Sequence, residues 1–338
     1  MYGNVLAGGS DINISTTNNN KIYLLGTVGQ LAGSNVTSTN ANIAISGSQL
    51  FDGQTAILNT QTGNITLRMN TASWGGLTLG TNGNIAVLPL SESAGFGHDF
   101  YDAWFGFNPT INGTSYIPTQ FTIGNSFNTY AIYWNSARTV NGPVSLYGAS
   151  VEVSANLITN NSTTGNVGIY GNLSGAGNIT LATGRAITVN QSGTSTYSGC
   201  ISGSTAQLIK AGAGTLNLTG NNTYSGATSI NAGSLIIGGT GLLGGGVYAG
   251  NISNAGNFTY NSSNAQILSG VISGAGNLSQ NGSGTLTLTG EDTYTGNTTI
   301  NAGTLQIGNG STSGSISTAN LVNNGTLTFN RSDSISQA

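Results

Sequence analysis

A long internal repeat, built from very short stretches of alternating apolar and polar residues, constrains the fold of this chain most strongly. Residues 212–238 read GAGTLNLTGNNTYSGATSINAGSLIIG, and residues 282–308 read GSGTLTLTGEDTYTGNTTINAGTLQIG. About two-thirds of the aligned positions are identical. A chain that repeats one supersecondary unit buries its apolar face by stacking that unit on its neighbours.

Each copy contains strands of three to five residues, separated by glycine and asparagine. Leu286 and Leu288 alternate with threonines, so the leucines face one side of a strand and the threonines the other. Glycine and asparagine tolerate the left-handed backbone conformation of tight corners. We assign structural roles to the shared aliphatic, tyrosine, asparagine and glycine positions of the two copies: Leu216, Leu218, Gly220, Tyr224, Ile230, Asn231, Gly233, Leu235, Leu286, Leu288, Gly290, Tyr294, Ile300, Asn301, Gly303 and Leu305.

Such short strands fit either a stacked β-helix or a propeller or sandwich. A 70-residue unit is longer than a propeller blade of about 40 to 50 residues, and it divides into about three coils of about 20 to 25 residues. Parallel strands joined by crossover connections are right-handed in nearly all proteins. No segment has a sustained helical period. The sequence therefore predicts an all-β fold, a right-handed parallel β-helix (β-solenoid).

We expect three segments along the chain. Residues 1–90 form β-solenoid coils, and residues 91–135 form an aromatic-rich loop or widened coils. Residues 136–338 form a β-solenoid that carries the repeats at 212–238 and 282–308.

Composition argues against a disordered chain and against several classes of function. Disorder is the first alternative for a chain rich in small polar residues, but disordered chains combine few hydrophobic residues with high net charge. This chain has 37% hydrophobic residues and a net charge of −3. Its six basic residues are scattered, which argues against nucleic-acid binding. No apolar window reaches the about 18 residues of a membrane span.

Two local features concern processing and redox state. The start, from Met1 to Asn4, has neither a basic region nor an apolar stretch, so we expect a fragment or a processed form. Cys200 is the single cysteine, which rules out an intramolecular disulfide and a cysteine-rich zinc site. Alignment of Cys200 with Val271 predicts an interior apolar position.

The segment 91–135 differs from the remainder because it is rich in phenylalanine, tyrosine and tryptophan. These rings either pack against the side of the solenoid or form a carbohydrate or protein contact surface. For the second alternative, we assign ligand contact to four residues: Tyr101, Trp104, Tyr133 and Trp134.

The same segment holds His98, Asp99 and Asp102, which raises the alternatives of glycosidic cleavage or metal binding. Nothing in the sequence determines the separation of the two carboxylates, and hard cations usually need more oxygen ligands. We therefore assign no catalytic, cofactor-binding or metal residue, and we expect no cofactor.

The block GSGTLTLTGEDTYTGNTTINAGTLQIG resembles the passenger-associated β-strand repeat of Gram-negative autotransporters. Residues 139–148 and 151–157 are similar to coils of large haemagglutinin-like bacterial adhesins, and residues 63–67 and 75–80 share that style. The resemblance implies a secreted passenger domain, exported by type V secretion. Its partner would be an outer-membrane β-barrel translocator in cis or in trans.

Two functions compete at this point. The first is a non-enzymatic structural and adhesive rod at the cell outer surface, whose loops contact a host or bacterial surface glycan or protein. The second is a β-helix glycan-binding or glycan-cleaving enzyme that uses the 91–135 region. A spacer without any ligand is a further alternative. The near-absence of ionisable groups favours the adhesive rod.

Overall fold

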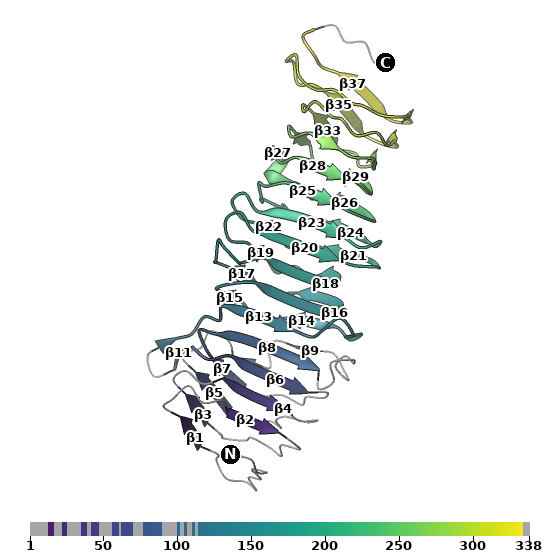
Figure 1. Cartoon of the computed structure of the whole chain (residues 1–338). Coiled ribbons are helices and arrows are strands. Elements are labelled where there is room, and N and C mark those ends of the chain that lie inside the picture. Colours follow the sequence, from purple (N-terminus) through teal and green to yellow (C-terminus); the bar gives the residue numbers. More distant parts are fainter. Residues whose placement is uncertain are drawn as a thin grey trace. The chain divides into compact units, whose positions relative to one another are not determined.

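The computed structural model describes residues 13–16, 22–25, 35–38, 42–46, 56–60, 62–69, 77–89, 100–101, 105–106, 110–111 and 114–333. It divides the chain into two compact units, Met1–Gly171 and Asn172–Ala338. In each unit, short strands stack in parallel, one coil upon the next (Figure 1). The predicted all-β, parallel β-solenoid is confirmed.

The first unit contains three stacks of parallel strands among its described residues. One runs β1-β3-β5-β7-β10, another runs β2-β4-β6-β8-β13-β16 and has a branch in which β9 pairs with β14 and β14 pairs with the end of β16, and in the third β15 pairs with β17. A short antiparallel pair joins β11 to β12. The strands are β1 (Asn13–Thr16), β2 (Ile22–Leu25), β3 (Asn35–Ser38), β4 (Ile43–Ser46), β5 (Ala56–Thr60), β6 (Ile65–Met69), β7 (Leu77–Gly80), β8 (Asn84–Pro89), β9 (Phe100–Tyr101), β10 (Phe105–Gly106), β11 (Thr110–Ile111), β12 (Thr114–Ser115), β13 (Gln120–Ile123), β14 (Ile132–Trp134), β15 (Arg138–Val140), β16 (Val144–Val153), β17 (Leu157–Thr159) and the start of β18 (Val167–Ser174).

The core of the first unit is a column of apolar side chains stacked in register. Ile43, Ile65, Ile85, Phe121 and Val144 lie on successive strands, and each is at most 1% exposed. Their polar neighbours in the sequence point outward, because side chains alternate along a strand. Alternation therefore directs one set of side chains of each strand into the solenoid, where these side chains pack on the equivalent set of the next coil.

One coil of the first unit is longer than its neighbours. The stretch of chain from Ile85 to its stacked partner Phe121 is much longer than the stretch from Ile65 to its stacked partner Ile85. The additional length falls in the aromatic-rich segment, much of which lies outside the described residues. The predicted segment boundaries at 91 and 135 stay a prediction.

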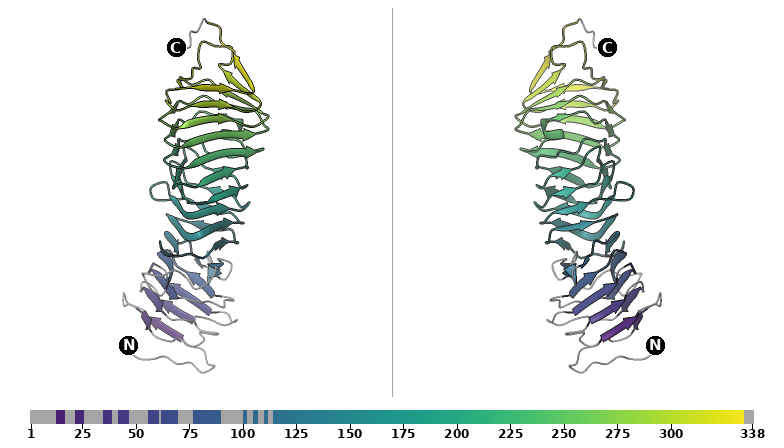
Figure 2. Two further views of the ribbon diagram at one scale, coloured as in Figure 1. Left: turned by 90° about the vertical axis from the view of Figure 1, so that its right-hand side faces the viewer. Right: turned by 90° about the vertical axis from the view of Figure 1, so that its left-hand side faces the viewer.

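The second unit contains three long stacks, which we name by their strands. Sheet I is β20-β23-β25-β28-β31, sheet II is β21-β24-β26-β29-β32-β34-β36, and sheet III is β27-β30-β33-β35-β37. Figure 2 shows the strands of this unit, coloured from teal to yellow, stacked one above the next. The elements are β19 (Ile179–Thr180), β20 (Ala186–Asn190), β21 (Thr194–Tyr197), β22 (Ile201–Ser202), β23 (Gln207–Ala211), β24 (Thr215–Leu218), β25 (Thr228–Ile230), β26 (Ser234–Gly239), the 3-10 turn η2 (Gly244–Gly246), β27 (Val247–Tyr248), β28 (Ile252–Asn254), β29 (Asn257–Ser262), β30 (Gln266–Leu268), β31 (Ile272–Ser273), β32 (Asn277–Gln280), β33 (Thr285–Leu288), β34 (Thr298–Ile300), β35 (Thr304–Ile307), β36 (Leu321–Asn323) and β37 (Thr326–Phe329).

The two repeat copies occupy different pairs of sheets. Leu216 stacks through Leu235 and Phe258 onto Leu278, so Leu278 lies three coils beyond Leu216 in sheet II. The repeat equivalent of Leu216 is Leu286, which comes later in the chain than Leu278 and already belongs to sheet III. The first copy lies in sheets I and II and the second in sheets II and III. One repeat therefore spans about three coils, as expected, together with a step to the next sheet.

Each copy stacks on itself, which explains how one motif fits two places. Leu216 pairs with Leu235, and Leu286 pairs with Leu305, at the same separation along the sequence. The motif thus specifies two stacked strands on each of two adjacent sheets. All ten aliphatic and tyrosine positions assigned from the sequence are fully buried: Leu216, Leu218, Tyr224, Ile230, Leu235, Leu286, Leu288, Tyr294, Ile300 and Leu305.

The prediction for Cys200 is wrong in one respect. Cys200 and Val271 do occupy equivalent corners, since their backbone N–H groups donate to Asn178 Oδ1 and Asn251 Oδ1, both at 3.0 Å. Both side chains, however, are half-buried rather than interior. The interior position belongs to the isoleucine that follows each of them, because side chains alternate across the strand.

Candidate functional site

Of the four residues assigned to ligand contact, two lie in β14. Trp134 is fully buried, its ring meets Phe121 edge-on at 5.6 Å, and its Nε1 donates to the carbonyl oxygen of Asn156 at 3.3 Å. A ring enclosed in this way is not available to a ligand, which corrects the prediction for Trp134. Tyr133 is half-buried and lies in register between Tyr101 and Glu152. Contact through Tyr133 stays a prediction.

The structure does not describe the side chains of the other residues that the sequence suggested for ligand contact, catalysis or metal binding. Tyr101 belongs to β9, but its side chain is outside the described residues. Trp104, His98, Asp99 and Asp102 lie outside the described residues altogether.

The first unit carries an aromatic pair that the sequence analysis did not single out. Tyr147 on β16 and Tyr170 on β18 stack with ring centroids 4.3 Å apart and planes 5° from parallel. Tyr170 is 36% exposed. Burial and the neighbouring Tyr170 raise the pKa of Tyr147, so its phenol stays neutral at physiological pH. The pair presents a flat, uncharged aromatic surface.

A turn next to this pair adds two more exposed rings. Phe127 is 54% exposed and Tyr130 is 40% exposed. Asn128 anchors the turn, because its Nδ2 donates to the carbonyl oxygens of Tyr147 at 2.7 Å and Tyr130 at 3.3 Å. We refer to the four rings together as the aromatic surface: Phe127, Tyr130, Tyr147 and Tyr170.

A sequence signal for the stacked pair was present. Residues 144–148 read VSLYG and residues 167–171 read VGIYG, so each tyrosine follows an alternating apolar pair by one position. Alternation places such a tyrosine on the outer face of its strand. The two tyrosines are as far apart in the sequence as Phe121 and Val144, which are stacked partners one coil apart.

In the second unit, the repeat copies share a connecting segment that covers the end of a sheet. We name residues 219–227 the first crossover and residues 289–297 the second crossover. In the first, the backbone N–H of Thr223 donates to the carbonyl oxygen of Ile201 at 2.9 Å, while Asn222 Oδ1 accepts from the N–H of Ile201 at 3.0 Å. The crossover therefore completes the hydrogen bonding of β22, the last strand of its sheet.

The second crossover repeats this geometry over β31, the last strand of sheet I. Thr293 N–H donates to the carbonyl oxygen of Ile272 at 2.9 Å, and Asp292 Oδ1 accepts from Ile272 N–H at 2.6 Å. Each crossover also holds a buried tyrosine. The hydroxyl of Tyr224 lies 2.8 Å from Thr228 Oγ1, and that of Tyr294 lies 2.6 Å from Thr298 Oγ1.

Lys210 and Gln280 are buried polar side chains at equivalent positions of the two copies. Lys210 Nζ donates to the carbonyl oxygens of Ala211 and Gly212, both at 2.9 Å, and burial lowers the pKa of its ammonium group. Gln280 Nε2 donates to the carbonyl oxygens of Gly282 at 2.9 Å and Gly284 at 2.8 Å. Both side chains donate to the carbonyl groups of a tight corner, so their role is structural, although the buried Oε1 of Gln280 has no hydrogen-bond partner.

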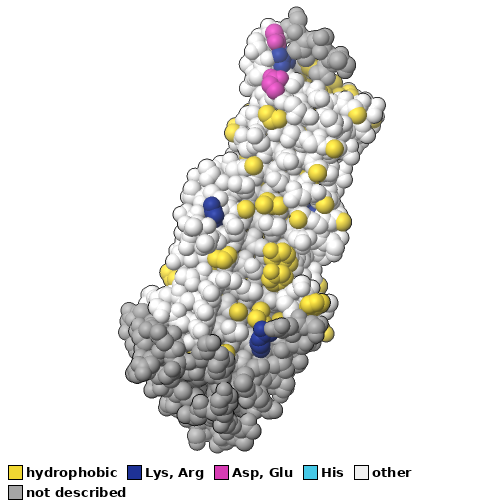
Figure 3. Space-filling model, in the orientation of Figure 1, with side chains coloured by type: hydrophobic (Ala, Val, Ile, Leu, Met, Phe, Trp, Pro, Cys, Tyr) yellow, Lys and Arg dark blue, Asp and Glu magenta, His cyan; other side chains and the backbone are white. Residues whose placement is uncertain are grey.

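The surface drawn in Figure 3 is mostly uncharged, with hydrophobic side chains scattered among polar ones. Among the described residues, no three His, Cys, Asp or Glu side chains are grouped so that they could hold a metal ion. The same residues include no helix with the length and hydropathy to cross a lipid bilayer.

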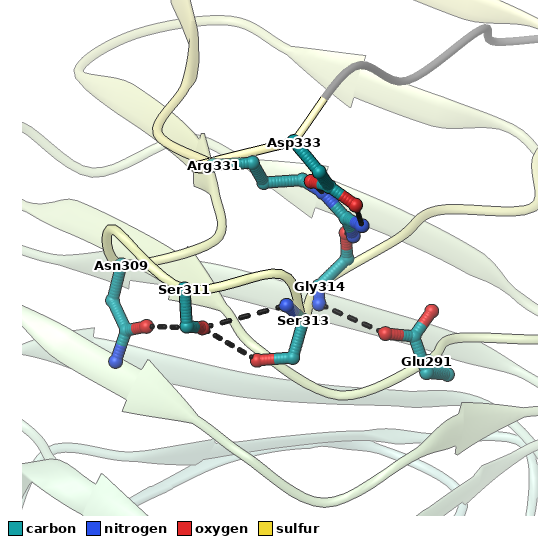
Figure 4. Close-up of polar contacts among 7 residues, drawn as sticks. All are labelled: Glu291, Asn309, Ser311, Ser313, Gly314, Arg331 and Asp333. Carbon is teal, nitrogen blue, oxygen red and sulfur yellow. Dashed lines mark hydrogen bonds and ion pairs between the residues drawn. The ribbon is translucent and has the colours of Figure 1, made fainter.

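A group of charged side chains lies near the last described coil (Figure 4). Arg331 makes a two-pronged ion pair with Asp333, through Nε at 2.9 Å and a terminal nitrogen at 2.8 Å, and it also donates to the carbonyl oxygen of Gly314. Glu291 accepts from the N–H of Gly314 at 3.1 Å. These contacts fasten the segment around Gly314 to the second crossover.

Comparison with known proteins adds one finding to this geometry. The family model of the passenger-associated transport repeat matches residues 208–237 and 278–307. The two repeat copies of this chain are thus similar to the passenger-associated transport repeat. The first match covers β23 to β26 and the second covers β32 to β35. Both are the unit of two stacked strands on each of two sheets that is described above. The repeat together with the β-solenoid agrees with an autotransporter passenger repeat protein. Neither a curated protein nor a solved structure matched the chain.

Proposed function

We propose that this chain is a segment of a secreted passenger-type adhesin, in which the β-solenoid is a non-enzymatic scaffold and outward side chains contact a cell or matrix. The observation that carries the proposal is the aromatic surface of the first unit. Stacked Tyr147 and Tyr170 and the exposed rings of Phe127 and Tyr130 combine apolar area with hydroxyl groups. Tyrosines of this kind favour contact surfaces because one ring edge is polar and the body is apolar.

The passenger-associated transport repeat supports export through an outer-membrane translocator and display at the cell surface. In the exporting organism, an antibody against the second unit should label intact cells. Labelling that appears only after the cells are permeabilised would contradict the proposed location.

A binding assay tests the contact surface directly. We expect the double variant Tyr147→Ser/Tyr170→Ser to lose at least about tenfold in binding to the cells or matrix that the intact protein recognises, equivalent to about 1.4 kcal/mol. Phe329→Ser is the matched control, because Phe329 is also exposed, at 45%, but lies in the second unit. Equal binding by the wild type and the double variant would exclude the aromatic surface as the contact.

The competing proposal is a glycan-cleaving enzyme that uses residues 91–135. An Asp99→Asn/Asp102→Asn variant and the intact protein should both leave a panel of glycans uncleaved if the scaffold is non-enzymatic. Cleavage by the intact protein that the double variant lacks would establish an enzyme and overturn the scaffold proposal.

A further inference from the structure

The two crossovers differ at one buried position, which is an amide in the first and a carboxyl in the second. Asn222 uses both ends of its amide: Oδ1 accepts from Ile201 N–H at 3.0 Å, and Nδ2 donates to the carbonyl oxygens of Gly220 at 2.9 Å and Leu242 at 3.3 Å. The side chain is fully buried. The first crossover is therefore held by one acceptor and one donor on the same group.

Asp292 fills the same place but has only half of this hydrogen bonding. Its Oδ1 accepts from Ile272 N–H at 2.6 Å, whereas its buried Oδ2 has no hydrogen-bond partner. Asp292 is 3% exposed, so water does not readily solvate that oxygen.

The backbone around Asp292 matches that around Asn222 in two contacts, although the N–H of Asn222 also donates to the carbonyl oxygen of Leu242 at 2.9 Å and no such bond joins Asp292 to Ser315. Ser315 N–H donates to the carbonyl oxygen of Gly290 at 3.1 Å, as Leu242 N–H donates to that of Gly220 at 3.2 Å. The bridge between Glu291 and Ser315 likewise matches that between Asn221 and Leu242. The carbonyl groups of Gly290 and Ser315 are thus the counterparts of the two that Asn222 Nδ2 satisfies. A carboxylate has no hydrogen to offer them, but a carboxylic acid has one.

The charged groups nearby do not supply a counter-ion. Burial is the main cause that raises the pKa of Asp292 to about 7; the Ile272 N–H lowers the pKa, and the charge of Glu291 adds to the rise. Residues 269–276 and 309–320 hold no titratable side chain. Tyr294 is neutral, since burial and the Asp292 charge raise its pKa to about 12. The cation of this region, Arg331, pairs with Asp333.

We propose that Asp292 takes up a proton from solvent in the folded protein, and that the resulting hydroxyl at Oδ2 donates to the backbone as Asn222 Nδ2 does. The second crossover is then a pH-sensitive latch over the end of sheet I at Ile272. It is closed while Asp292 is neutral, and it loosens when the proton leaves and an unpaired carboxylate remains buried.

The sign of the pH dependence follows from this scheme. Folding raises the pKa of Asp292 above the ordinary value, so the folded state binds more protons than the unfolded state between those two values. The stabilisation is complete below the unfolded pKa and is lost as the pH rises through about 7.

Hydrogen exchange at Ile272 tests the latch on the full chain. After correction for intrinsic exchange rates, we expect the protection of Ile272 N–H to fall on the order of tenfold or more between about pH 5 and about pH 8. The equivalent Ile201 N–H, under Asn222, should not change. Asp292→Asn should remove the pH dependence at Ile272, and Asn222→Asp should transfer it to Ile201.

Equal pH dependence in the wild type and in Asp292→Asn would overturn the proposal. So would recovery of Ile272 protection at about pH 8 on adding calcium, because the site would then hold a cation instead of a proton. If Asn222→Asp fails to fold, the carboxyl carbon of Asp292 can be titrated by NMR in the wild type. A titration near the ordinary pKa of about 3.9 would equally refute the proton site.

Discussion

At the scale of single residues, the solenoid depends on corners that only certain side chains allow. Gly233 and Gly303 hold equivalent corners, with φ of 68° and 62°, and a Cβ at Gly233 would collide with the carbonyl oxygen of Gly214 on the coil beneath. Glycine is needed at these corners for two reasons: the backbone is left-handed, and two coils approach each other closely.

Two glycines allow these causes to be separated. Gly245 has φ of 67°, nearly that of Gly233, but no atom lies within 4 Å of its Cβ position. We expect Gly245→Ala to cost about 1 kcal/mol of unfolding free energy, from backbone strain alone. Gly233→Ala should cost about 1–3 kcal/mol more because the coils must move apart. Thermal or denaturant unfolding measures both, and equal costs would show that coil contact does not matter at Gly233.

Lys210 supports a second residue-scale prediction. Its counterpart Gln280 satisfies two corner carbonyl groups with a neutral amide. We therefore expect Lys210→Gln to cost less unfolding free energy than Lys210→Met, for which the loss should be about 1–3 kcal/mol because buried carbonyl groups lose their donor. Comparable destabilisation by the two variants would contradict this role.

At the scale of elements, the repeat is a pair of two-strand stacks joined by a crossover that ends a neighbouring sheet. This arrangement explains why the second copy can begin one sheet further round than the first. The internal register that pairs Leu216 with Leu235 is preserved in the second copy, although the surrounding sheets differ. Each copy therefore stacks on itself in the same register, whichever pair of sheets it occupies.

The buried tyrosines of the crossovers should differ in importance. Tyr294→Phe removes the partner of the buried Thr298 hydroxyl, and we expect a loss of about 1–3 kcal/mol. In Tyr224→Phe the loss should be smaller, because Thr228 Oγ1 keeps the hydroxyl of Tyr248 at 2.7 Å. Unfolding of both variants under the same conditions gives the comparison, and the reverse order would count against it.

At the scale of the whole molecule, packing and backbone hydrogen bonds stabilise the chain, since charged residues make up 4% of it. Ion pairs at the surface contribute little in water, and in Arg331–Asp333 the carboxylate is 38% exposed although the arginine side chain is 10% exposed. Stability should spread over neighbouring coils, as expected when each coil contacts only the next.

The scarcity of charge leads to a prediction for the intact chain. Raising sodium chloride from about 0.05 M to about 0.5 M should shift the Tm by no more than about 2 °C, because few charge pairs exist for salt to screen. Calorimetry at one pH below 6 is the appropriate measurement, so that Asp292 keeps its proton. A shift of about 10 °C would reveal an electrostatic contribution that this structure does not account for.

The sequence by itself determined the fold class and the interior positions of the repeat, because the alternation of Leu286 and Leu288 and the glycine corners are local properties. It could not show that the second copy of the motif lies one sheet further round, since that depends on the lengths of three intervening coils. It also missed that Trp134 is core and that Tyr147 meets Tyr170, because those contacts join residues on different coils. Only the tertiary structure decided which oxygen of Asp292 lacks a partner, since burial and the positions of backbone groups determine which hydrogen bonds a carboxyl group can make.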